Sequence, residues 1–366
     1  MENDKALVKN NKLIGLEIIR FISSFAVLIW HYQHFCYVAD MPMGFVKEDQ
    51  PFYELFSFFY NYGAWGVQVF WSISGFIFFW KYQDTISKNL ITAWRFSVLR
   101  FSRLYPLHLL TLIIVLILQY LYFHKNNYSF VYQYNDFYHF FLQLFLASNW
   151  GIQKGYSFNG PIWSVSVEVI VYFFFFLTLR IVKKPLMTIV GVLVICGIAK
   201  LMKGVAPIID CFAFFYMGGL TSIFLNKISG SRYEKSIKVM SQVGLVFFPV
   251  ICVLLRLHTI KYFAFVFLMC YAPLIIFVLS QDISLSPKWC AIIESLGNLT
   301  YASYLIHFPI QLFIALLCSY IQVSIPMYSS AFFISFIGST FFLSFIIFRF
   351  FEMPLQSMIR KRLQVS

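Results

Sequence analysis

Long apolar segments separated by short polar or basic ones make up most of the chain. Several of these segments reach or approach 20 residues, which is about the length that an α-helix needs to cross a bilayer. No soluble stretch between them is long enough to form a separate domain. The pattern therefore predicts an all-α polytopic membrane protein with about ten transmembrane helices. We expect these helices at 13–36, 62–80, 104–123, 161–180, 186–202, 207–225, 239–256, 262–280, 294–319 and 328–350.

One further apolar segment, at 137–158, is too short to cross comfortably, because its apolar and aromatic part covers only 137–150. The predicted helix that follows ends at Arg180, with Lys183 and Lys184 just beyond it. Basic residues of membrane proteins concentrate on the cytoplasmic side. If these lysines and the basic segment 81–103 are both inside, the chain between them must cross an even number of times. The helices 104–123 and 161–180 already supply two crossings, so a third is excluded. We therefore expect 137–158 to be a re-entrant or interfacial segment on the outer side.

Composition and charge agree with this prediction. Of 366 residues, 60% are hydrophobic and only 12% are charged, and the formal net charge is +13. The positive-inside rule explains this charge, since most basic residues fall in segments predicted on one side, with both termini in the cytoplasm. Nucleic-acid binding is not indicated, because the chain has no basic domain or RNA-binding motif. The main basic segments are 1–12, 81–103, 227–238 and 360–362.

The cysteines carry no recognisable site. All seven are scattered, with no CxxC and no spacing typical of metal ligands. Most lie inside apolar segments, where cysteine packs as a small hydrophobic side chain. We expect neither a disulfide framework nor a metal site.

The first predicted helix, 13–36, carries ionisable groups at membrane depth. Arg20 and His31 are eleven residues apart, so they share one helix face and lie about 16 Å apart along the axis. Such groups are costly in a bilayer and should face the bundle interior or a wet cavity, where they usually serve a function. The alternative is a structural ion pair between Glu17 and Arg20, with a hydrogen-bonded core histidine.

Arg100 and Arg103 are one helical turn apart at the predicted cytoplasmic end of the helix 104–123. Paired guanidinium groups suit phosphate, because they form bidentate, charge-assisted hydrogen bonds with it. The alternative is a pair of anchors that only set the topology. Pro106 fits the start of this helix.

The predicted helix at 161–180 carries a carboxylate. Ser164 and Glu168 share a face, and Trp163 sits at the level of the membrane interface. An unneutralised Glu168 would be costly, so it should pair with a cation or bind a polar ligand. Asn159 or Gly160 is a candidate cap for the helix start, with Pro161 in the first turn.

Two other predicted helices carry smaller polar clusters. In 62–80, Ser72, Ser74 and Gly75 could let two helices approach closely. In 294–319, a single helix face carries Thr300, Tyr304 and His307. A hydrogen-bonded core histidine is the alternative to a chemical role for His307.

Taken together, these motifs make the sequence resemble acyltransferase family 3 of the membrane-bound O-acyltransferases. The resemblance covers nearly the whole chain, with six motifs in the family's order. One departure is Gln68, which stands where many members carry Asp. The motifs are R-x10-H at Arg20 and His31, V-x-x-F-F/W-x-x-S-G-F at 67–76, R-x-x-R at Arg100 and Arg103, P-x-W-S-x-x-x-E at 161–168, a segment with Ser303, Tyr304, Leu305 and His307, and E-x-P at Glu352 and Pro354.

The resemblance implies transfer of an acyl group, most often acetyl from cytoplasmic acetyl-CoA. The acceptor would be a hydroxyl of a cell-surface glycan, such as lipopolysaccharide O-antigen or capsule, or of a lipid-linked glycan. It also implies a multi-pass protein among the lipids of the bacterial inner membrane. Some members continue into an extracytoplasmic SGNH hydrolase-like domain. We expect residues 1–366 to form a single acyltransferase domain without that extension.

Roles for individual residues follow from the resemblance. His31 would act as general base or as a transient acyl carrier, with Arg20 and Glu168 as further catalytic residues. Acetyl-CoA would be a co-substrate held without a metal. The donor contacts would be Arg100, Arg103 and Ser74, and the acceptor contacts Trp163, Ser164, Tyr304 and His307.

The rival interpretation is a polytopic transporter or flippase for a glycan or lipid-linked sugar. Its intramembrane charges would then mark a substrate path. Such proteins often carry inverted repeats, and the sequence shows no internal repeat.

Overall fold

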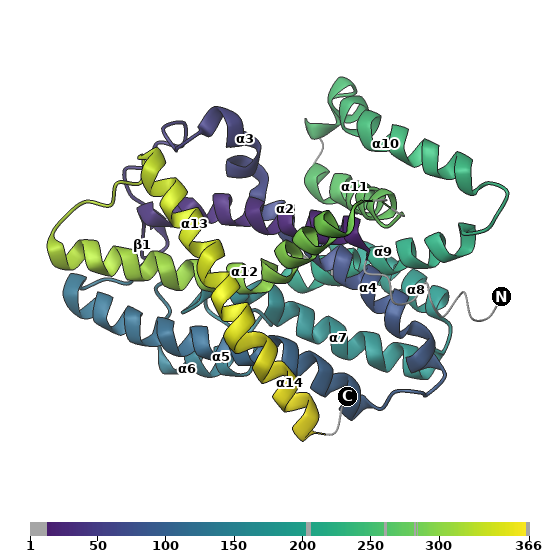
Figure 1. Cartoon of the computed structure of the whole chain (residues 1–366), viewed down its shortest axis with the longest axis horizontal. Coiled ribbons are helices and arrows are strands. Elements are labelled where there is room, and N and C mark those ends of the chain that lie inside the picture. Colours follow the sequence, from purple (N-terminus) through teal and green to yellow (C-terminus); the bar gives the residue numbers. More distant parts are fainter. Residues whose placement is uncertain (1–12, 203–205, 260–261, 282, 284, 364–366) are drawn as a thin grey trace.

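The computed structural model describes residues 13–202, 206–259, 262–281, 283 and 285–363. Within these ranges the protein is mostly helical (Figure 1), and its strands are two short ones that form a hairpin, β1 (Tyr37–Val38) and β2 (Met41–Pro42). The fold is therefore that of an all-α polytopic membrane protein, as predicted. The α-helices are α2 (Ile14–His31), α3 (Tyr53–Tyr62), α4 (Gly66–Ser87), α5 (Ala93–Asn126), α6 (Phe137–Leu144), α7 (Trp163–Val182), α8 (Pro185–Leu201), α9 (Pro207–Ile228), α10 (Glu234–Leu254), α11 (Phe263–Leu279), α12 (Pro287–Ile321), α13 (Ser330–Ile347) and α14 (Met353–Arg362).

Each of the ten predicted membrane helices has one counterpart, in order α2, α4, α5 and α7 to α13. Seven helical segments of the described chain are long and apolar enough to cross a membrane. The apolar helices α8 and α11 have 17 residues each, which corresponds to about 26 Å at 1.5 Å per residue. The existence and order of the ten helices are confirmed, and ten crossings stay a prediction. The terminal residues 1–12 and 364–366, predicted in the cytoplasm, lie outside the described ranges.

The outer surface of the bundle is apolar. Large hydrophobic side chains are exposed on the helices at the periphery, among them Ile117 on α5, Val246 on α10 and Phe342 on α13. Soluble monomers rarely expose large contiguous apolar patches. These faces are suited to lipid, and the protein is a multi-pass membrane protein.

Loops predicted on the same side of the membrane lie together. The loops after α2 and α5 meet where the Ala39 N–H donates to Ser129 O at 3.2 Å. At the other end, the Arg180 guanidinium, in the last turn of α7, donates to Ile91 O at 3.3 Å, in the loop after α4. In Figure 1, β1 and the junction of α12 and α13 occupy the left end of the bundle.

The predicted basic loop at 81–103 is wrong. Most of this range is helical, and α5 begins at Ala93 rather than at 104. Thr92 provides the start signal, because its side chain accepts a hydrogen bond from the Arg95 N–H at 3.2 Å. Pro106 accordingly lies inside α5 and not at its start.

The expectation for 137–158 is confirmed in that this segment makes no full crossing. Its helix, α6, has eight residues, or about 12 Å of length. The His108 Nε2 atom of α5 bonds Gln143 O at 2.7 Å, and the Gln143 amide donates to Ser157 O at 2.7 Å. The rest of the segment is irregular backbone, which the second bond ties to α6, while the first ties α6 to α5.

Small residues bring α4 and α9 together, as the sequence predicted for Gly75. A Cβ atom at Gly75 would lie 1.7 Å from Phe215 O, and one at Gly218 would lie 1.8 Å from Ser72 O. Neither position therefore accepts a side chain, and the backbones of the two helices touch. This contact fixes the wall of the bundle that carries Ser74.

Candidate active site

Two cavities lie near opposite ends of α2. We name the first the arginine cavity, because Arg20, Arg100 and Arg103 line it, and its volume is about 250 Å³. We name the second the histidine cavity, because His31 and His34 line it, and its volume is about 430 Å³. The prediction that Arg20 and His31 face the bundle interior is confirmed.

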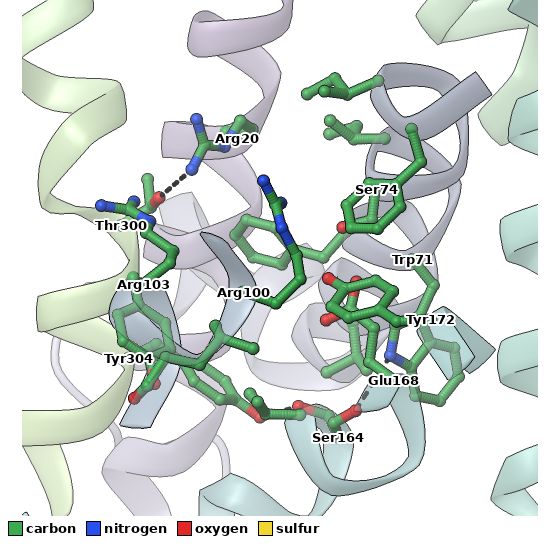
Figure 2. A pocket seen from close by; sticks show the side chains of 18 residues that line it. Arg20, Trp71, Ser74, Arg100, Arg103, Ser164, Glu168, Tyr172, Thr300 and Tyr304 are labelled. Atoms are coloured by element: carbon green, nitrogen blue, oxygen red, sulfur yellow. Dashed lines mark hydrogen bonds between the residues drawn. The ribbon is translucent and has the colours of Figure 1, made fainter. Parts of the chain in front are cut away.

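Five helices build the arginine cavity. Figure 2 shows Arg20, Arg100 and Arg103 around one opening, with Ser74 and Glu168 across from them. The arginines come from α2 and α5, Ser74 from α4 and Glu168 from α7, while α12 contributes Thr300, Tyr301 and Tyr304. The cavity thus brings together the expected donor contacts.

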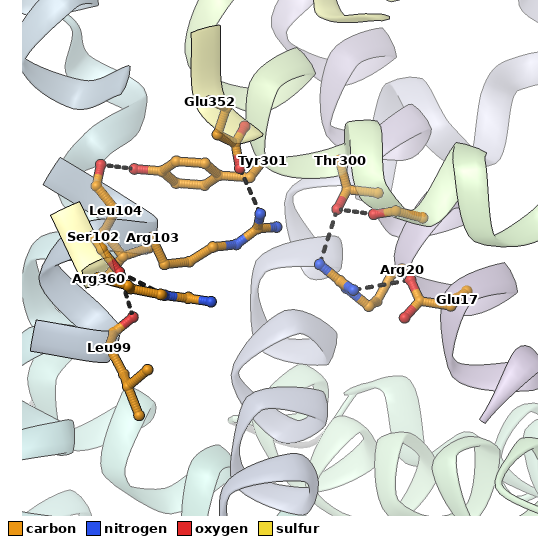
Figure 3. A network of polar contacts seen from close by, with 11 residues as sticks. Glu17, Arg20, Leu99, Ser102, Arg103, Leu104, Thr300, Tyr301, Glu352 and Arg360 are labelled. Atoms are coloured by element: carbon orange, nitrogen blue, oxygen red, sulfur yellow. Dashed lines mark hydrogen bonds and ion pairs between the residues drawn. The ribbon is translucent and has the colours of Figure 1, made fainter. Parts of the chain in front are cut away.

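Arg20 is held by its neighbours. Its Nη1 atom lies 2.9 Å from Glu17 Oε2, and its Nη2 atom donates to Thr300 Oγ1 at 3.3 Å (Figure 3). The absence of a side chain at Gly297 makes this possible, since a Cβ there would lie 1.9 Å from Glu17 Oε2. The predicted alternative of a structural Glu17–Arg20 pair is therefore present, at the edge of the cavity.

Arg103 and Arg100 differ in their partners. Arg103 Nη1 lies 2.5 Å from Glu352 Oε1, an ion pair whose carboxylate is buried (Figure 3). Arg100 donates to Tyr82 Oη at 2.8 Å and lies over the Phe78 ring at 4.8 Å. In the part of the chain that the structure describes, Arg100 makes no ion pair with a carboxylate, and its buried Nε has no hydrogen-bond partner. Arg100 is therefore the cation best able to take an anionic ligand.

Glu168 lies in the arginine cavity and not in the histidine cavity. Arg100 and Arg20, which line the same cavity, are positive charges that act on its carboxylate. Its Oε1 atom is buried without a hydrogen-bond partner among the described residues. Glu168 is thus placed to act on whatever enters beside the arginines.

The histidine cavity is lined mainly by rings. Trp30, Tyr132, Tyr156 and Trp163 contribute aromatic side chains, and Asp40 contributes a carboxylate. Burial raises the pKa of the Asp40 carboxyl, and hydrogen bonds from Gln133 oppose this shift. No lysine or arginine lines this cavity among the described residues. Its chemistry therefore suits a neutral polar ligand better than an anion.

Three histidines meet at the edge of this cavity. The His31 Nδ1 atom lies 2.9 Å from His307 Nε2, and the His34 ring stacks on His31 with centroids 4.6 Å apart. His307 Nδ1 lies 3.2 Å from Ser303 O, and the Gln311 amide donates to His31 O at 2.9 Å. The helix α12 thus holds both the ring and the backbone of His31. His307 itself lines neither cavity.

A thin partition separates the two cavities. The Tyr304 hydroxyl lies 2.8 Å from Ser164 Oγ and donates to Pro161 O at 2.6 Å. The Trp71 Nε1–H donates to Ser164 O at 3.3 Å, and Val67 lines both cavities. The expected acceptor contacts Ser164 and Tyr304 therefore belong to the boundary, on the arginine side, whereas Trp163 lines the histidine cavity.

The predicted cap role of Asn159 is wrong. Its side chain makes no cap hydrogen bond, and a 3₁₀ turn, Gly160–Ile162, precedes α7. The Asn159 amide instead donates to Thr111 Oγ1 at 3.1 Å and to Leu305 O at 3.0 Å. The buried amide nitrogen of Asn159 therefore bonds two neighbouring helices, α5 and α12, instead of capping α7.

Several lining residues escaped the sequence analysis. His34 has a detectable signal, since it follows His31 by three residues. Asp40, Tyr132 and Tyr156 have none, because they lie in loops without a periodic pattern. Gln68 lines neither cavity, and its amide, with the nitrogen toward the backbone, donates to Ala64 O at 3.0 Å. Over the described ranges no group of three or more His, Cys, Asp or Glu could hold a metal ion.

Comparisons with known proteins agree with the motifs. A family model described as an acyltransferase domain, that of acyltransferase family 3, matches residues 13–349. The match includes α2 to α13 and both cavities. No curated protein and no solved structure matched the chain. Since the match covers nearly all of the chain, the protein belongs to acyltransferase family 3 and is a membrane acyltransferase.

Proposed function

We propose that the protein transfers acetyl from cytoplasmic acetyl-CoA to a hydroxyl of a cell-surface glycan, at the outer side of the bacterial inner membrane. The observation that carries this proposal is the pair of cavities along α2. One is lined by three arginines and the other by His31, with Tyr304 and Ser164 between them.

The arginine cavity suits the donor. The phosphates of acetyl-CoA need cations, and Arg100 and Arg103 lie near the start of α5, where Arg360 of α14 also donates to Ser102 Oγ at 3.1 Å. At about 250 Å³ the cavity lies below the usual range for drug-sized ligands of about 300–1,000 Å³. It would hold the pantetheine arm, while the bulkier nucleotide stays near its mouth.

The histidine cavity suits the acceptor. Rings such as Trp30 and Tyr156 offer flat apolar faces to a sugar, and Asp40 can accept a hydrogen bond from one of its hydroxyls. The lack of a lysine or arginine in the described lining disfavours a phosphate or carboxylate in this cavity. The glycan unit that enters should therefore be neutral or carry an amino group.

The chemistry requires the two ligands to meet at His31. As general base, its ring takes the proton of the acceptor hydroxyl while the hydroxyl oxygen attacks the thioester carbonyl carbon. The new C–O bond forms, the C–S bond breaks, and the proton passes to the leaving sulfur of coenzyme A. The thioester must first pass between Tyr304 and Ser164, whose hydrogen bond of 2.8 Å would then open.

The test uses purified protein in sealed liposomes with labelled acetyl-CoA supplied on one side. Acceptor oligosaccharides from bacterial surface polysaccharides are enclosed on the other side. Mass spectrometry should detect an O-acetylated sugar on the side opposite the donor. Transport of the oligosaccharide without acetylation would overturn the proposal in favour of a flippase.

A further inference from the structure

The hydrogen bonds around His31 and His307 determine which ring nitrogens carry protons. His307 Nδ1 lies 3.2 Å from the carbonyl oxygen of Ser303. A carbonyl oxygen can only accept a hydrogen bond, so His307 must carry its proton on Nδ1. A neutral imidazole has one N–H, and His307 Nε2 is therefore an acceptor.

The same reasoning then applies to His31. Its Nδ1 lies 2.9 Å from His307 Nε2, and the two rings are within 12° of parallel. Because His307 Nε2 can only accept, His31 must donate from Nδ1. The proton of neutral His31 is then on Nδ1, and its Nε2 keeps a free lone pair.

The position of the remaining nitrogen agrees with this assignment. His31 Nε2 makes no hydrogen bond within the described chain, and the protein does not fully enclose this atom. Since His31 lines the histidine cavity, this nitrogen borders the cavity. The other ring, His34, stacks on His31 and does not compete for Nδ1.

We infer that His307 is a positioning residue that fixes the tautomer of His31, so that Nε2 is the nitrogen that reacts. The relay runs from Ser303 O through His307 to His31. This inference rests on the proposed function and deepens it, because it assigns His307 to His31 rather than to the acceptor.

Every proton in the proposed step has a donor and an acceptor within this relay. His31 Nε2 takes the hydroxyl proton and becomes doubly protonated, while its Nδ1–H continues to donate to His307 Nε2. The proton on Nε2 then passes to the departing sulfur of coenzyme A, and His31 returns to its starting tautomer. His307 thus plays the part that a carboxylate or carbonyl plays behind other catalytic histidines.

The first test reads the tautomer directly and does not depend on activity. Protein labelled with ¹⁵N-histidine is studied by NMR in lipid nanodiscs, and the His31 signals are identified by their loss in His31→Gln. We expect Nδ1 protonated and Nε2 unprotonated in the wild type, and a mixture of tautomers in His307→Leu. A wild-type His31 protonated on Nε2 would overturn the inference even if acyl transfer were confirmed.

The second test reads kinetics. His307→Leu should lower kcat roughly 10–100-fold, the scale known for the loss of a group that orients a metal-binding histidine, with the KM for the donor unchanged. His307→Gln keeps an acceptor oxygen near His31 Nδ1 and should recover part of kcat. This second variant keeps the test decisive if the leucine variant folds poorly. A leucine variant with wild-type kcat, or a glutamine variant no better than leucine when both are folded, would count against the relay.

The matched control is His108→Gln, a buried histidine on α5 that bonds a backbone carbonyl at 2.7 Å and lines neither cavity. It should keep the tautomer of His31 and the wild-type kcat. If instead the wild type transfers no acyl group to any acceptor, the proposed function fails, and the NMR result still decides on the tautomer.

Discussion

At the scale of single residues, His31 carries the chemistry of the proposed reaction. His31→Ala should lower turnover by ~10²-fold or more, the usual scale for general acid–base catalysis. His31→Gln should be nearly as inactive, because glutamine cannot take a proton at neutral pH. Steady-state assays, with donor affinity measured by calorimetry, test this. Wild-type acetylation by His31→Gln would remove His31 from the reaction.

Arg100 should matter more for donor affinity than Arg103, because Arg103 is already paired with Glu352. Arg100→Gln removes a charge-assisted hydrogen bond worth ~1.5–3 kcal/mol, which corresponds to roughly a 10- to 150-fold higher Kd for acetyl-CoA. Calorimetry in detergent measures this change. The control Lys88→Gln removes an exposed charge near the same end of the bundle and should leave Kd unchanged. Equal affinity in wild type and Arg100→Gln would make Arg100 a topology anchor only.

At the scale of elements, the contact of α4 with α9 should tolerate no side chain at its centre. Gly75→Val places a Cβ where the nearest backbone oxygen lies only 1.7 Å away, so the helices must separate. Overpacking of this kind typically costs ~1–3 kcal/mol, and thermal unfolding in detergent should show a lower midpoint. Gly191→Val is the matched control, since a Cβ at that helical glycine meets nothing within 4 Å. Equal midpoints for the two variants would contradict the close contact.

The pair between Arg103 and Glu352 links α5 to the π-helical turn Phe348–Glu352 before α14. The Glu352 carboxylate is only 2% exposed, so Arg103→Gln leaves a buried charge without its partner. Such a loss typically lowers the free energy of unfolding by ~3–5 kcal/mol. The double variant Arg103→Gln with Glu352→Gln should recover most of the unfolding midpoint but not the donor affinity. A double variant as unstable as the sum of the two single variants would show that the pair contributes little.

At the scale of the whole molecule, the two cavities make sense only if the ends of the bundle face different compartments. In a cysteine-free background, Lys154→Cys should react with an impermeant maleimide in intact spheroplasts. Lys88→Cys should react only after the membrane is opened. Labelling of Lys154→Cys only after opening would reverse the predicted sidedness and place the histidine cavity inside.

The sequence by itself determined the membrane class, the existence and order of ten helices and the residues around which both cavities form. Each of these depends on a local property. A run of apolar residues predicts a helix whatever its neighbours are, and groups such as Arg20 and His31 must avoid lipid wherever the helix packs. The same reasoning identified Gly75 as a contact residue.

The tertiary structure alone decided how these residues divide into two cavities. Glu168 joins the arginines, Trp163 joins His31, and Tyr304 closes the boundary. Pairings between residues far apart in the chain, such as His31 with His307, have no local signal. The start of α5 is an exception, because the Thr92 cap is a local signal that hydropathy does not read. Hydropathy reports transfer of a segment into lipid, whereas hydrogen-bond geometry and the choice of partner exist only once the helices have packed.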